Sequence, residues 1–310
     1  MQIQKLSRSA IIDEQWDNTI LSAYNVMPYG LSWYLDAVAD SWDAIVFGNY
    51  DWVMPLPFTL KFGVKMYSQP PFCQQLGPFG RTKPSQNIVK LFVEALPLNA
   101  LRLSLNFSED LILNTPSLKF LERTNQLLEI EKPLDEIELN FNRSVRRNIK
   151  SGQEKMTGLE EIFDPKLVIE FYQKNLDKKV KLKEKDYKKA LALFEAARAN
   201  NMMRFYQIRS KDNNAVTARG AFLIGPNRVY NLFSSSLNDK INKGAASYLI
   251  YLVIEAFAGK KKYFDFEGSS IPSIKKYFAS FGAISKTYQR LDRMHPILKL
   301  IHKAKMNLRT

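Results

Sequence analysis

The chain has 310 residues, of which 45% are hydrophobic and 25% charged, with a formal net charge of +14; this composition is typical of a folded globular protein and excludes wholesale disorder. No stretch contains the roughly 18–20 consecutive apolar residues of a membrane-spanning helix, and the N-terminal segment lacks the apolar core of a secretory signal. The single cysteine, Cys73, excludes an internal disulfide and a thiolate metal site, so we expect a cytoplasmic protein.

The first half of the chain predicts helices that alternate with strands. The turn sequence Gly48–Asp51 separates two apolar runs, which indicates a β-hairpin. The loop PPFCQQLGPFGRTKPS is so rich in Pro and Gly that we expect no regular structure in it. In chain order, the predicted elements are a helix at 31–38, strands at 44–47, 52–60 and 64–68, a helix at 86–96 and a strand at 101–107.

The second half repeats this order of elements. Two helices are predicted at 165–178 and 184–200, followed by strands at 203–209, 216–224 and 228–233, a helix at 245–257 and a strand at 263–266. The helix-then-strand pair recurs with an offset of about 160 residues, which favours two copies of one fold. We therefore expect two domains, an N-terminal one over 1–140 and a C-terminal one over 141–310.

The segment 136–150 lies between the two halves and predicts one basic helix. Its apolar residues recur every four positions, close to one helical turn, and its basic residues form a neighbouring face: Arg143, Arg146, Arg147 and Lys150. Up to Asp135 the chain has 11 Lys and Arg against 14 Asp and Glu; the remainder has 34 against 17. This asymmetry indicates either an anionic partner of the second half or plain solubility charge.

The loop LNDKINKGAAS carries the clearest candidate for a binding site. It follows the strand VYNLFSSS and opens a helix with small residues in its first turn. Such a turn lets backbone N–H groups and the helix dipole hold a phosphate, although small residues also serve helix packing. The candidate cofactor-binding residues are Ser235, Asn242, Lys243, Gly244, Ala245 and Ala246.

The segments NKGAASYLIYLVIEAFAGKKKYFDFEGS and IPSIKKYFASFGA resemble the GNAT acyltransferase fold, in particular the FemAB-like double-GNAT family of peptidoglycan-branching aminoacyltransferases. In GNAT proteins a loop of the type R/Q-x-x-G-x-G/A holds the coenzyme A pyrophosphate, and 241–246 is similar to it without the first Arg or Gln. The resemblance implies an α/β (α+β) fold of two GNAT-like units, each a mixed, largely antiparallel sheet flanked by helices. The first unit is then degenerate and the second carries the donor site.

The resemblance also implies a function. It predicts an N-acyltransferase or aminoacyltransferase that moves an acyl group from coenzyme A or aminoacyl-tRNA to an amine, such as a cell-wall or envelope precursor. Transfer RNA is the further partner that it allows. Separately, the basic half and the C-terminal tail allow peripheral contact with a membrane surface. The alternative is a non-catalytic GNAT-fold binding protein for an anionic partner, which the degenerate loop favours.

Acyl transfer to an amine needs a path for the amine proton and a stabiliser of the oxyanion, but no nucleophilic side chain. By resemblance we expect Asp265 to act as the base, with Glu267 and Tyr263 beside it. The tyrosine that GNAT enzymes use as an acid would fall at Phe278, so Tyr277 is expected to point elsewhere. His295 and His302 lie in a C-terminal tail predicted to be an amphipathic helix, docked or on a membrane, and we expect no metal site.

Overall fold

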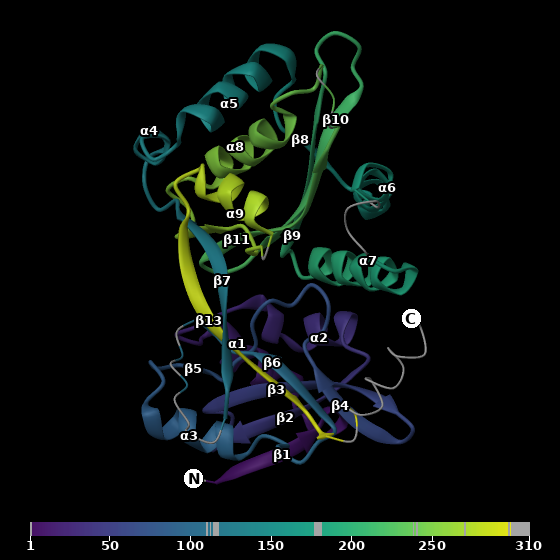
Figure 1. The fold of residues 1–310 in the computed structure, drawn as a ribbon, viewed down its shortest axis with the longest axis vertical. Coiled ribbons are helices and arrows are strands. Elements are labelled where there is room, and N and C mark those ends of the chain that lie inside the picture. Colours follow the sequence, from purple (N-terminus) through teal and green to yellow (C-terminus); the bar gives the residue numbers. More distant parts are fainter. Residues whose placement is uncertain are drawn as a thin grey trace. The chain divides into compact units, whose positions relative to one another are not determined.

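Figure 1 shows the computed structural model, which describes residues 2–109, 111, 113, 118–176, 182–237, 239, 241–269, 271–296 and 298. The chain forms two compact units, Thr124–Lys286 and a first unit made of Met1–Arg123 and the segment that begins at Thr287. The predicted boundary after residue 140 lies beyond β7 (Phe120–Glu129), whereas this division falls inside that strand. The chain returns to the first unit inside β13 (Ile284–Met294).

The sheet of the first unit has the strand order β1-β2-β3-β4-β6-β13, and β5 pairs with β3. The pair β4–β6 is parallel, whereas β1–β2, β2–β3, β3–β4, β3–β5 and β6–β13 are antiparallel. The strands are β1 (Ile3–Ser7), β2 (Ser41–Phe47), β3 (Trp52–Lys61), β4 (Val64–Ser68), β5 (Phe79–Gly80) and β6 (Arg102–Asn106).

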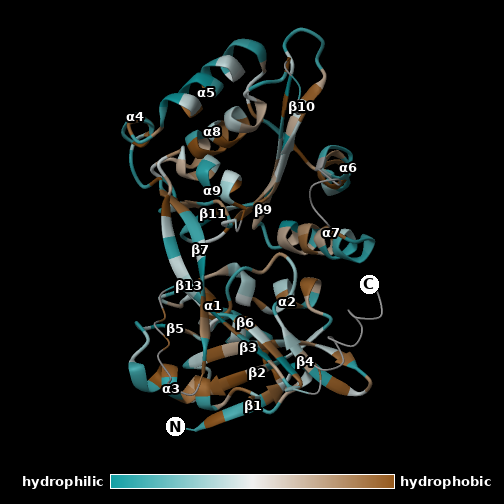
Figure 2. Cartoon of the chain, viewed as in Figure 1, coloured by the Kyte–Doolittle hydropathy of each residue, from teal (hydrophilic) through white to brown (hydrophobic). Residues whose placement is uncertain are grey.

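Helices cover this sheet, and Figure 2 shows hydrophobic stretches along β2 and β3. One helix, α3 (Gln86–Glu94), packs through Val89, Phe92 and Val93 onto strand residues such as Leu105. Other helices contact β2, β3 and β5. The helices besides α3 are η1 (Arg8–Ala10), α1 (Asp13–Leu21), η2 (Pro28–Gly30) and α2 (Ser32–Val38).

The sheet of the second unit has the order β7-β12-β11-β10-β9-β8, in which β11–β12 is parallel and the other pairs with a known register are antiparallel. Helices α5 and α8 share a hydrophobic core with one face. The other face packs against α6 and α7 through Phe233, whose ring contacts Tyr172 and Phe194. The strands are β8 (Glu160–Ile162), β9 (Met203–Arg209), β10 (Val216–Ile224), β11 (Arg228–Ser236) and β12 (Tyr263–Asp265).

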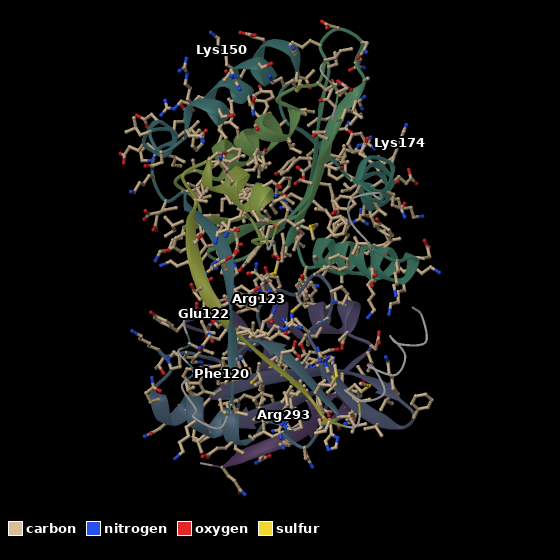
Figure 3. The ribbon with its side chains drawn as sticks, in the orientation of Figure 1. Phe120, Glu122, Arg123, Lys150, Lys174 and Arg293 are labelled. Carbon is tan, nitrogen blue, oxygen red and sulfur yellow. The ribbon has the colours of Figure 1, made fainter. Side chains whose placement is uncertain are left out.

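The helices of this unit are α4 (Leu134–Glu138), α5 (Arg143–Lys155), α6 (Pro165–Leu176), α7 (Glu184–Ala199), α8 (Ala245–Phe257) and α9 (Pro272–Ala279). The prediction of one continuous helix over 136–150 is wrong. Asn142 accepts a hydrogen bond from the Val145 N–H and starts a new helix, since Asn favours an N-cap over a helix interior. The basic residues nevertheless lie on α5, where Lys150 is exposed (Figure 3).

The predicted α/β (α+β) class, with mixed and largely antiparallel pairing flanked by helices, is confirmed. The Pro- and Gly-rich loop does contain one short strand, β5, because Trp52 and Val53 of β3 pair with it. Of the predicted C-terminal helix, residues 297 and 299–309 lie outside the described residues. Within the described part of the chain, no helix combines the length and the hydrophobicity of a membrane span.

Candidate functional site

Strands β11 and β12 run side by side for only three residue pairs. The last pair is Tyr230 with Asp265, after which β12 ends while β11 continues through Ser236. Beyond that point β11 has no register partner in β12, so its edge on that side opens. Because an open strand edge presents backbone N–H and C=O groups, this stretch is suited to an extended, amide-bearing ligand.

Two buried side-chain oxygens on this part of β11 lack a hydrogen-bond partner within the described chain, Asn231 Oδ1 and Ser235 Oγ. Both residues are 7% exposed. An unsatisfied buried polar group costs about 1–3 kcal/mol. The two atoms therefore mark positions where a ligand or a water molecule would stabilise the site.

A bulge places these two oxygens on opposite faces of the sheet. Asn231 pairs with Phe222, which belongs to the core shared with α8, whereas Ser235 pairs with Arg219. The Arg219 guanidinium donates to the carbonyl of Leu167 in α6, at 3.0 Å. Because directly opposed residues share a face, Asn231 lies on the α8 side and Ser235 on the α6 side.

Gly244 caps α8 and is fixed there by packing. Its φ is +99°, and a Cβ on it would lie 2.4 Å from the carbonyl oxygen of Asn148 in α5. Gly152 of α5 lies similarly close to α8, since a Cβ added to it would lie 2.3 Å from the Cβ of Tyr248. Packing and backbone conformation thus explain why position 244 of the predicted phosphate loop is a glycine, without any bound ligand.

The loop before α8 already holds an anionic group of its own. The Asp239 carboxylate accepts from the Asn242 backbone N–H at 2.7 Å and from its side-chain amide at 2.9 and 2.8 Å. The backbone hydrogen bond from Asn242 lowers the pKa of Asp239. Lys243 is exposed, Ala245 is buried and Ala246 is half-buried. Helix geometry leaves first-turn N–H groups free, so the amide of Ala246 is the best placed for an external anion.

The three residues predicted to be catalytic gather around one buried carboxylate. Asp265 is 1% exposed, and its Oδ2 accepts from Asn125 at 2.9 Å and from Arg228 at 3.2 Å. Its Oδ1 accepts from the Glu267 backbone N–H at 2.8 Å. The Arg228 guanidinium also lies over the ring of Tyr263, 5.4 Å from its centroid. Asp265 therefore ties β7, β11 and β12 together.

This cluster and the α8 loop do not lie on the same face. Phe264 packs in the core shared with α8. Because alternate strand residues point to opposite faces, Tyr263 and Asp265 point away from α8. The catalytic roles of Asp265, Glu267 and Tyr263 stay predictions.

Tyr277 is a candidate that the spacing argument set aside. Its hydroxyl lies 3.2 Å from Ser247 Oγ in the first turn of α8, and its ring packs edge-on against Phe281. Phe278 instead stacks on Phe266, with ring centroids 4.7 Å apart. Burial raises the pKa of Tyr277 to about 12. At neutral pH the Tyr277 hydroxyl is thus protonated and can donate a hydrogen bond, and it lies beside the loop predicted to bind the acyl donor.

This pKa predicts a stability difference at alkaline pH. The folded chain holds the Tyr277 proton more tightly than the unfolded chain, whose tyrosine pKa is about 10, so the contribution is present below pH 10 and is lost as the pH rises through about 12. Urea titrations at pH 8 and pH 11 measure how far the free energy of unfolding falls between the two pH values. This fall should be larger in the wild type than in Tyr277→Phe. Equal losses in the two proteins would contradict the assignment, because every other tyrosine is common to both.

Two further candidates of the sequence, Cys73 and His295, lie in structural positions. Cys73 is buried, the backbone N–H of His295 bonds to Leu101, and His302 lies outside the described residues. Among the residues that the structure describes, no group of three or more His, Cys, Asp and Glu side chains is arranged to hold a metal ion.

Comparison with known proteins places the fold. The crystal structure of FemX superposes with a TM-score of 0.70 over 97% of this chain and 100% of FemX, at 11% sequence identity. The chain has the FemAB-like double-GNAT fold. A tandem GNAT protein from the clavulanic acid biosynthesis pathway matches 94% of this chain and 98% of its own, with a TM-score of 0.53 and 12% identity.

The C-terminal DUF2156 domain of an Agrobacterium fabrum protein described as a putative lysylphosphatidylglycerol synthetase has the same fold. It covers 95% of this chain and 96% of its own, with a TM-score of 0.56 and 11% identity. No protein-family model and no curated protein sequence matches the chain. The double-GNAT assignment therefore rests on three-dimensional similarity.

Proposed function

We propose that this double-GNAT chain is an N-acyltransferase or aminoacyltransferase, with coenzyme A or aminoacyl-tRNA as donor and an amine as acceptor. The observation that carries the proposal is the divergence of β11 from β12 on a strand that contacts α8. An open strand edge suits an extended chain of amides, and a helix N-terminus suits a phosphate. Coenzyme A combines both chemical groups.

The residues present fit such a donor in part. The unpartnered Asn231 Oδ1 and the open edge of β11 would hold the amide-bearing arm, and the Ala246 N–H with Lys243 would hold the phosphates. Asn242 is less suited, because the Asp239 carboxylate already accepts from its N–H. When bound, the acyl thioester of coenzyme A would supply an activated acyl group, and coenzyme A would leave as the free thiol.

Proton transfer in this proposal uses residues on both sides of β12. Tyr277, protonated until about pH 12, donates to the oxygen or leaving group on which charge develops. Glu267 accepts the amine proton, positioned by the bond from its N–H to Asp265. In this arrangement Asp265 orients the base, Glu267, instead of reacting, and Tyr263 packs beneath Arg228.

The acceptor is proposed to be an amine-bearing cell-wall or envelope precursor in the cytoplasm, and transfer RNA remains a donor candidate. Three exposed basic side chains of α5 support an anionic partner: Arg143, Arg147 and Lys150. The Arg146 guanidinium instead donates to the carbonyls of Glu138 and Phe141. The second candidate function is a non-catalytic binding protein. The observation that favours it is Asp239, whose carboxylate occupies the loop where a donor phosphate would sit.

Replacing Ala246 with aspartate tests the donor site without disturbing the helix. An acidic residue in the first turn interacts favourably with the helix dipole but repels a bound phosphate. Coenzyme A at about one hundred times its dissociation constant should stabilise the wild type by about 2.7 kcal/mol. We expect a thermal shift of several degrees in the wild type and in Asn87→Asp, which adds the same charge to the first turn of α3, but none in Ala246→Asp. If the wild type does not shift, coenzyme A is not the donor.

A further inference from the structure

The turn between β3 and β4 carries apolar side chains that the fold does not cover. Strand β3 is buried from Trp52 to Phe58 and becomes exposed at its end. Leu60 is 63% exposed, Phe62 104% and Val64 42%. We call 60–65 the hairpin tip; Figure 1 shows it at the end of the β3–β4 pair, in the first unit. Three neighbouring exposed apolar residues on one turn call for an explanation.

The turn conformation does not explain Phe62. Phe62 and Gly63 have φ of 52° and 74°, and two consecutive positive φ values define a type I′ turn, which prefers Asn-Gly. A bulky side chain in this region is strained. Gly63 would have nothing within 4 Å of an added Cβ, and the Phe62 ring is fully exposed. Neither local geometry nor packing within the described chain therefore accounts for an aromatic residue here.

Lysines flank the apolar side chains on both faces of the hairpin. Leu60 pairs with Lys65, and Lys61 pairs with Val64. Because directly opposed residues share a face, each face of the tip presents one apolar and one lysine side chain. Lys61 is exposed and makes no ion pair within the described chain, whereas Lys65 Nζ lies 2.5 Å from Asp43. The apex is thus apolar, and the charge of Lys61 lies just behind it.

This arrangement fits a lipid surface better than a protein groove. A groove would cover one face, but here apolar groups point to both faces and to the apex. In a bilayer interface, apolar side chains enter the acyl boundary on all sides, and a lysine such as Lys61 extends its ammonium group to an anionic headgroup. We propose that the hairpin tip inserts into the interface of an anionic membrane and binds the chain there reversibly. This inference is independent of the proposed reaction.

Replacing Phe62 with asparagine separates membrane binding from folding. Asn suits the type I′ turn, so the thermal midpoint should stay equal or rise. Burial of a phenylalanine is worth about 1.5–3 kcal/mol, so Phe62→Asn should bind at least about tenfold more weakly. The measurement is co-sedimentation with vesicles of phosphatidylcholine in which about one third of the lipid is phosphatidylglycerol. Phe163→Asn, at another exposed phenylalanine (71%), is the matched control and should bind as the wild type does.

The charge of Lys61 allows a second test of the proposal. Lys61→Glu should weaken binding to the phosphatidylglycerol vesicles and leave binding to pure phosphatidylcholine unchanged, and added salt should have the same effect on the wild type. The proposal is overturned if the wild-type chain does not sediment with the anionic vesicles. It is equally overturned if Phe62→Asn binds as tightly as the wild type, or if Phe163→Asn loses as much.

Discussion

Replacing Asp265 with alanine is expected to lower the free energy of unfolding by about 3–5 kcal/mol, because it breaks a buried ion pair from one side. Asp265 and Arg228 are 1% and 11% exposed, and the same carboxylate also accepts from Asn125 and from the Glu267 N–H. Urea denaturation at neutral pH measures the loss. The expected effect is large because the carboxylate links three adjacent strands.

The matched control is Asp292→Ala. Asp292 pairs with two arginines, Arg102 at 2.9 Å and Arg290 at 3.6 Å, but all three side chains are about a quarter exposed. Exposed ion pairs contribute about 1 kcal/mol or less, so this variant should unfold close to the wild type. A small effect in both variants would rule out the clamping role of Asp265. An Asp265 variant that keeps its stability but loses activity would instead support Asp265 as the base.

Gly244→Ala should lower the free energy of unfolding by about 2–4 kcal/mol. The new Cβ would meet the Asn148 carbonyl oxygen at 2.4 Å, and alanine is strained at a φ of +99°. Gly259→Ala is the control, since Gly259 has a φ of +69° and nothing within 4 Å of the added atom. That variant should lose only about 1 kcal/mol.

The comparison also decides how the donor loop should be probed. If Gly244→Ala is as mild as Gly259→Ala, α5 can move away from α8 and the glycine serves another purpose. If Gly244→Ala is severe, a bulky residue there would unfold the unit, and loss of ligand binding would carry no information. Ala246, half-buried and in the first turn, avoids this problem.

The sequence predicts strands well where an apolar alternation is bounded by turn residues. The predicted strands 64–68, 203–209 and 216–224 and the helix 245–257 have the observed bounds. Strands β7 and β13 escape prediction because their pattern is mostly polar. In β13 only Tyr288 and Leu291 are buried, so no alternation stands out. These two strands are held by non-local pairing that the local sequence does not encode.

Some features of the candidate site also follow from the local sequence, whereas others depend on contacts between distant segments. The start of α8 at Ala245 follows from the small residues before an apolar run. The role of Gly244 does not, because its neighbour is a carbonyl oxygen of α5, far away in sequence. Asn231 also escapes prediction, since the bulge near it reverses which side chains face α8. Tyr277 shows the limit of spacing rules, because a helix shifted by one residue still brings its hydroxyl to Ser247.

The place of β13 in the first unit has a consequence for biosynthesis. β13 pairs with β6, Leu291 opposite Leu105, yet the ribosome makes it only after the whole second unit. Until then the nascent first unit lacks a strand, and β6 has an open edge that can recruit another chain. Completion of the first unit therefore waits for translation to reach Met294. The second unit is contiguous in sequence, so its folding need not wait for the strand segment that completes the first unit.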